Sequence, residues 1–154
     1  MNNTRSKTLI RACQSVGAVL AGLLAVAVLS VGTDVVLHAA GMFPPWGQPV
    51  GGGVLLLATV YRTIYSVAGA YLTARLAPER PMSHALTLGG VGFVLSIAGA
   101  VGTWNRGPAF GPHWYPLALV ALAVPQCWAG GALRRMQLRA GLKDAGEPAR
   151  IRRA

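Results

Sequence analysis

Four long apolar runs dominate this chain of 154 residues and decide what it can fold into. The runs cover residues 16–31, 54–77, 85–101 and 117–133. Each is close to the ~20 residues that an α-helix needs to cross a hydrocarbon layer ~30 Å thick. Because the runs are continuously apolar and do not alternate with polar residues, they predict membrane-spanning helices and not membrane-spanning strands.

The composition agrees with a membrane as the surroundings of these helices. Hydrophobic residues make up 53% of the chain and charged residues 12%, whereas soluble domains carry roughly 25% charged residues. Four acidic and fourteen basic side chains are too few to cover the surface of a compact soluble domain of this size. The sequence therefore predicts an all-α fold, an integral membrane four-helix bundle.

Proline and glycine mark the connections between the runs, at 41–53, 78–81 and 105–116. The shortest of them predicts an antiparallel hairpin of the second and third helices. The expected domain organisation is a cytoplasmic N-terminus at 1–11, a four-helix membrane domain at 12–134 and a basic cytoplasmic tail at 135–154. Within the membrane domain the helices are expected at about 12–33, 54–77, 84–104 and 116–135.

Basic residues are distributed very unevenly between the two ends of this topology. Of the fourteen, only Arg106 falls at the end opposite the termini, and only Arg62 falls inside a span. The others precede the first helix, flank the 78–81 turn or follow the last helix. Since positively charged segments stay on the cytoplasmic side, both termini are predicted to be cytoplasmic.

A cleaved signal peptide is an alternative interpretation of the N-terminus, because a basic segment precedes an apolar one. The apolar run is longer than the core of a signal peptide, and residues 37–41 contain no clear cleavage site. The sequence thus favours a retained first helix.

Arg62 is the most informative residue, since an arginine near the centre of a span costs ~2.5–3.5 kcal/mol on insertion scales. In the first helix, Ser30, Asp34 and His38 recur every four residues and share a face. An ion pair between Asp34 and Arg62 would neutralise both charges and fix how the first two helices lie together. Alternatively, Asp34, His38 and Arg62, with Ser66 one turn from Arg62, form an intramembrane polar cluster for proton-coupled or anion-binding function.

Metal binding is not predicted, because Asp34 and His38 would need a third ligand from His113 or the distant His84. The familiar enzyme motifs are missing, so catalysis is not favoured and no cofactor is expected. Two cysteines are too few for a disulfide framework or a multi-cysteine metal centre.

The fourth apolar run contains Pro125 and Gln126 near its middle. Proline removes a backbone hydrogen bond and predicts a kink there. Gln126 can donate a hydrogen bond to a neighbouring helix.

Small residues at four-residue spacing let helix backbones approach closely. This spacing relates Ala18 to Gly22, Gly69 to Thr73, and Gly92 to Ser96. The same pattern serves contacts inside a bundle and contacts between copies, so a homo-oligomer or another membrane partner stays open.

The basic tail predicts contact with anionic lipid headgroups, to which juxtamembrane bases contribute ~1 kcal/mol each. The lipid bilayer itself is the expected surroundings. The tail contains no known nucleic-acid motif and no interleaved aromatics, so nucleic acid is not favoured as a partner.

Several short motifs carry a resemblance: Gly32-Thr33-Asp34 with His38, Phe43-Pro44-Pro45-Trp46-Gly47, Tyr61-Arg62 with Tyr65, Ala77-Pro78 with Pro81, and Gly111-Pro112-His113-Trp114-Tyr115-Pro116. Together they resemble small bacterial four-span membrane proteins over residues 16–133. The resemblance implies a multi-pass location in the bacterial inner membrane and no particular activity. The favoured function is a structural or accessory membrane subunit, and the alternative is a small transporter or proton-linked permeation protein.

Overall fold

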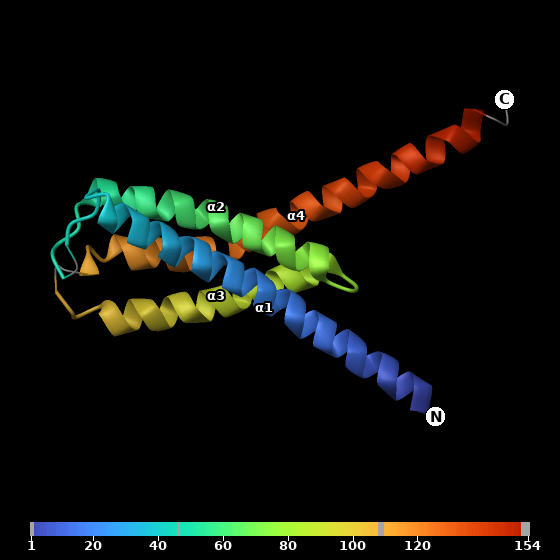
Figure 1. The fold of residues 1–154 in the computed structure, drawn as a ribbon, viewed down its shortest axis with the longest axis horizontal. Helices are drawn as coiled ribbons and strands as arrows, with labels where there is room; N and C mark the ends of the chain where they lie inside the picture. The colour runs from blue at the N-terminus through green and yellow to red at the C-terminus, as the bar shows by residue number, and fades with distance from the viewer. Residues whose placement is uncertain (1, 46, 108–109, 152–154) are drawn as a thin grey trace.

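The computed structural model describes residues 2–45, 47–107 and 110–151. These residues form four helices and no strand: α1 Asn2–Ala39, α2 Gly52–Leu76, α3 Pro81–Thr103 and α4 Trp114–Ile151. Figure 1 shows the four helices side by side in a bundle, with α1 and α4 extending beyond it at the same end. The all-α prediction is confirmed, and the arrangement is that of a four-helix bundle.

Every helix contains a segment that is long and apolar enough to cross a membrane. These segments are Ser6–Ala39, Gly52–Leu76, Pro81–Thr103 and Trp114–Leu142. Large apolar side chains also lie on the outside of the bundle, for example Val28 at 68% and Val94 at 64% exposed. A bundle that presents so much apolar surface indicates a multi-pass membrane protein.

Both terminal helices are longer than their apolar runs. α1 begins at Asn2, well before residue 12, and α4 continues beyond residue 135, through Gly141 and Pro148, to Ile151. Apolar length reports where hydrocarbon could surround a helix, whereas the helix itself needs only its own backbone hydrogen bonds and continues into polar surroundings. Residues 152–154 of the predicted basic tail lie outside the described residues.

The turn between α2 and α3 follows from its two prolines. Pro78 disfavours a helical conformation at Ala77, which is extended (φ −61°, ψ 130°), so α2 ends at Leu76. Arg80 adopts a left-handed conformation (φ 47°), and Pro81 then starts α3, where its missing N–H costs nothing. The hairpin predicted for these two helices is present (Figure 1).

An ion pair joins the N-terminal part of α1 to this turn. Arg11 Nη1 lies 2.6 Å from Glu79 Oε1, and both side chains are more than half exposed. The N-terminus and the α2–α3 turn therefore lie at the same end of the bundle, which is also where the extended part of α4 leaves it (Figure 1).

Helix α2 lies between the others and contacts all three, while α4 contacts α2 and α3. The central core is built from small residues, with Ala70 and Ala74 of α2 and Ala85 of α3 almost fully buried. A Cβ atom added at Gly130 of α4 would lie 2.8 Å from Cβ of Ala70. Small side chains at these positions thus let α2, α3 and α4 come into close contact.

The crossing of α1 and α2 depends on two glycines. A Cβ added at Gly22 would lie 2.7 Å from the carbonyl oxygen of Gly69 and would overlap the Thr73 hydroxyl. A Cβ added at Gly69 would lie 2.9 Å from the carbonyl oxygen of Gly22. At Gly92, in contrast, an added Cβ meets nothing within 4 Å, so this small-residue position does not serve a helix crossing.

Candidate functional site

The Asp34 carboxylate of α1 is held by two donors from α2. Arg62 Nη2 lies 2.5 Å from Asp34 Oδ2, and the Tyr61 hydroxyl donates a hydrogen bond to Asp34 Oδ1. The Asp34 side chain is 17% exposed and that of Arg62 32%. The ion pair expected from the sequence is therefore present, and each carboxylate oxygen has its own donor.

A further hydrogen bond joins α1 to α2 beside the ion pair. The Tyr65 hydroxyl, one turn after Tyr61, lies 2.9 Å from Thr33 Oγ1. Thr33, Asp34, Tyr61, Arg62 and Tyr65 together make up what we call the α1–α2 seam. Tyr61 and Tyr65 are four residues apart, so both rings project from the face of α2 that lies against α1.

Apolar side chains cover part of the seam at the end of the bundle away from the termini. Phe43 and Ala58 are buried beside Tyr61, and Leu37 and Tyr115 pack against them. This cover limits access of water to the seam. Hydrogen bonds and ion pairs are stronger where water is excluded, so the seam joins α1 to α2 firmly.

His38 follows Asp34 by one helical turn, at the end of α1. Its Nδ1 lies 2.7 Å from the backbone oxygen of Asp34, and its ring packs edge-on against Phe43 at a centroid distance of 5.0 Å. It lines a shallow depression with Pro44 and Pro45. The contacts described here place the imidazole against the α1–α2 connection.

Gln126 of α4 makes the contact across the bundle that its position predicts. Its Nε2 donates to Thr63 Oγ1 at 3.0 Å, and the Thr63 hydroxyl donates to the backbone oxygen of Thr59 at 2.7 Å. α4 is helical through Pro125. Together with the seam, this bond makes α2 the helix through which both α1 and α4 are joined by polar contacts.

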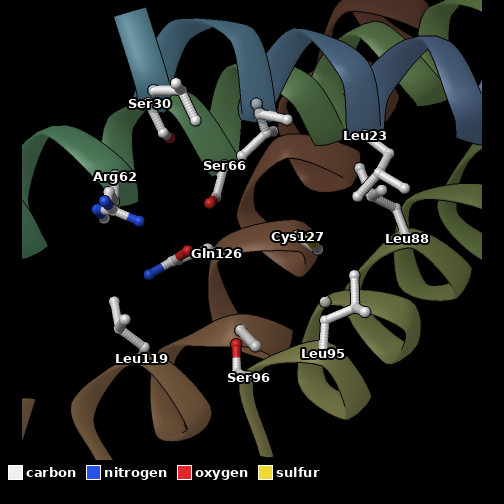
Figure 2. Close-up of a pocket in the computed structure, with 15 residues that line it drawn as sticks. Leu23, Ser30, Arg62, Ser66, Leu88, Leu95, Ser96, Leu119, Gln126 and Cys127 are labelled. Atoms are coloured by element: carbon white, nitrogen blue, oxygen red, sulfur yellow. The ribbon is translucent and has the colours of Figure 1, made fainter. Parts of the chain in front are cut away.

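A cavity of about 310 Å³ lies beside the seam and is lined by all four helices (Figure 2). Most of its wall is apolar. The polar lining residues come from each helix in turn: Ser30 of α1, Arg62 and Ser66 of α2, Ser96 of α3 and Gln126 of α4. Figure 2 shows the Arg62 guanidinium and the Gln126 amide facing each other at one side of this cavity. Arg62 thus belongs to both the seam and the cavity, and Ser66 only to the cavity.

One donor atom of the Arg62 guanidinium is not hydrogen-bonded. Its Nε is buried and has no hydrogen-bond partner among the described residues. An unsatisfied buried donor costs about 1–3 kcal/mol, so the guanidinium is satisfied less completely than the Asp34 carboxylate.

The described residues do not bring three His, Cys, Asp or Glu side chains close enough together to hold a metal ion. His113, one of the two residues considered as a third ligand beside Asp34 and His38, stacks on Trp104 at a centroid distance of 4.3 Å. Its Nε2 lies 3.1 Å from the Trp104 backbone oxygen. This residue therefore fastens the α3–α4 connection.

The sequence predicts the ion pair but not the residues that surround it. Thr33 and the two tyrosine hydroxyls were not expected to bond across the interface, although the four-residue spacing of Tyr61 and Tyr65 beside Arg62 is the signal that could have shown it. The cavity left no such signal, because it depends on how far apart the helices lie.

No protein-family model, curated protein or solved structure matches the chain. The seam supplies a balanced ion pair that holds two helices together. The cavity supplies hydrogen-bond donors in an apolar wall, which is the usual character of a small-molecule binding site.

Proposed function

We propose that the chain is an integral protein of the bacterial inner membrane, with both termini cytoplasmic, that acts as a structural or accessory membrane subunit. Four apolar helices and an apolar outer surface support the membrane location. The unequal distribution of basic residues supports the orientation. The resemblance to small bacterial four-span proteins supports the choice of membrane.

The structural role is supported by the Asp34 carboxylate, because both of its oxygens are bonded to residues of α2. Tyr61 and Arg62 each take one of its oxygens, so rotating or sliding α1 against α2 would break two charge-assisted bonds at once. Breaking one partner of such a pair leaves an uncompensated charge in an apolar region, which is strongly unfavourable. The seam thus gives α1 and α2 a single rigid arrangement, as a scaffold in the membrane needs.

Its partners in this role are the bilayer and either a second copy or another membrane protein. Exposed apolar side chains on the outer faces of all four helices would contact lipid or such a partner. Bases in the extended part of α4, including Arg134, Arg135 and Arg139, would lie near anionic headgroups at the cytoplasmic side.

A small transporter or proton-linked permeation protein is the second candidate, and the cavity beside Arg62 is the observation that favours it. The two roles differ in what Asp34→Asn does. In a scaffold this change lowers thermal stability, because Arg62 loses its counter-charge. In a transporter the fold survives and flux through reconstituted vesicles is lost.

Membrane location and orientation can be tested by labelling single cysteines. In a chain carrying Cys13→Ser and Cys127→Ala, we would add Ser83→Cys near the start of α3 or Asn105→Cys after its end. A membrane-impermeant maleimide applied to intact cells is expected to label only the Asn105 variant. Both variants should react after the membrane is disrupted, which is the control.

The reverse labelling pattern would overturn the orientation. Release of the protein from membranes by alkaline carbonate would overturn the integral membrane location itself.

A further inference from the structure

The cavity described above combines an apolar wall with a polar side. Leucines from three helices form much of the wall: Leu23 of α1, Leu88 and Leu95 of α3, and Leu119 of α4. Arg62 and Gln126 stand together on the polar side (Figure 2). Its volume of about 310 Å³ is the space of roughly ten water molecules at ~30 Å³ each and falls in the range of small-molecule sites. A molecule that fits it is apolar over most of its length and polar at one end.

The polar side offers donors. The Arg62 guanidinium lines the cavity and uses Nη2 on Asp34, and the Gln126 amide uses one N–H on Thr63 and keeps a second. The hydroxyls of Ser30 and Ser66 project from α1 and α2 into the same space (Figure 2). The serine hydroxyls and Gln126 Oε1 can also accept, but the Arg62 guanidinium can only donate, so a head group beside it has to accept hydrogen bonds.

The charge at the site is already balanced. Arg62 is paired with Asp34 at 2.5 Å, so a bound anion would add an uncompensated negative charge beside the Asp34 carboxylate. A cation would face the guanidinium directly. Charges are costly in an apolar region unless they are paired. A neutral acceptor, such as a carbonyl oxygen, avoids both costs.

The cavity opens sideways. Two of its lining residues, Val31 of α1 and Leu95 of α3, are 60% and 56% exposed. The opening thus lies between α1 and α3, which in a membrane-spanning bundle face hydrocarbon. An apolar molecule dissolved in the bilayer would enter by this route without crossing water.

We propose that this cavity binds a neutral, carbonyl-headed apolar molecule taken up from the bilayer. The carbonyl oxygen accepts hydrogen bonds from the Arg62 guanidinium and from Gln126 Nε2, and the apolar body lies along the leucine wall. The proposal rests on the membrane location proposed above, but not on the scaffold role.

The test uses the full-length chain purified in detergent and follows its thermal unfolding midpoint with four probes of equal chain length. The probes are 2-decanone, decane, decanoate and decylammonium, which differ only in the head group. A ligand that binds the folded state raises its stability. We expect 2-decanone to raise the midpoint most, decane less, and the two charged probes less than 2-decanone.

A matched pair of glycine variants locates the effect in the cavity. An added Cβ meets nothing within 4 Å at either Gly92 or Gly90 of α3, but only Gly92 lines the cavity. Gly92→Leu should therefore fill the cavity and abolish the shift with 2-decanone, and Gly90→Leu should keep it. Ser96→Leu, which fills the same space from another position, replaces Gly92→Leu should that variant fail to fold.

Three results would overturn the proposal. The first is no shift with any probe, and the second is a larger shift with decanoate or decylammonium than with 2-decanone. The third is an equal shift in the Gly92 and Gly90 variants, which would mean that the probes act through the micelle. If the protein is not an integral membrane protein, alkaline carbonate will release it from membranes. That result is separate from the thermal-shift results and does not change what they show about the cavity.

Discussion

At the scale of single residues, Asp34 explains why this chain tolerates charges in an apolar bundle. A lone carboxylate in such surroundings is very unfavourable, but Arg62 neutralises it and Tyr61 satisfies its second oxygen. The guanidinium is satisfied less completely, since its Nε has no hydrogen-bond partner among the described residues. The acid is thus fully committed to the helix interface, whereas the base also lines the cavity.

Tyr61→Phe should therefore destabilise the protein more than Tyr65→Phe. Both changes remove one hydroxyl, but Tyr61 donates to a carboxylate and Tyr65 contacts the neutral Thr33. Hydrogen bonds to charged groups contribute about 1.5–3 kcal/mol, and bonds between neutral side chains in membranes average about 0.6 kcal/mol. Unfolding of the two variants in a denaturing detergent mixture measures the difference. Equal losses would show that the Tyr61 hydroxyl is not held by a charge.

At the scale of helices, α2 organises the bundle. It meets α1 at Gly69, meets α4 closely at Ala70 and carries the donors of the α1–α2 seam. Polar contacts and close backbone approach take the place of the hydrophobic driving force, which is weak between helices in lipid. The position of each helix therefore depends on a few residues and not on a large apolar core.

The close approach of α1 and α2 predicts opposite effects of two alanine substitutions in the same helix. Gly22→Ala places a methyl group against the Gly69 carbonyl and should cost about 1–3 kcal/mol as overpacking. Gly17→Ala meets nothing within 4 Å and should be neutral or stabilising by up to about 1 kcal/mol, because alanine favours helix. Thermal unfolding of the two variants measures the difference. Equal stability of the two variants would contradict a close approach of α1 and α2 at Gly22.

The bond between α4 and α2 gives a further comparison. Gln126→Leu removes the hydrogen bond to Thr63 and should cost up to about 2 kcal/mol. Gln137→Leu removes the hydrogen bond that Tyr71 donates to Gln137. Because this bond is exposed and water competes for it, its loss should lower the unfolding free energy only slightly. The unfolding free energies of both variants test this order, and a larger loss in the Gln137 variant would contradict it.

At the scale of the whole molecule, the sequence predicts the four helices well because continuous apolar length is a strong signal. It also predicts the Asp34 to Arg62 pair, since few charged residues occupy the spans and the partners are limited. It places the ends of α1 and α4 poorly, because polar helix beyond the hydrocarbon has no comparable signal. The cavity is not predictable from the pattern, as it arises from the separation of α1 from α3 and α4 in three dimensions.

The ion pair between Asp34 and Arg62 fixes α1 against α2. A charge exchange tests this role by comparing the thermal stability in detergent of the native protein, Asp34→Arg, Arg62→Asp and the double exchange. Each single change leaves two like charges facing each other and should cost about 3–5 kcal/mol or more. The double exchange restores opposite charges and should recover most of this loss, which appears as a large coupling energy. Losses that simply add in the double exchange would contradict this role of the ion pair.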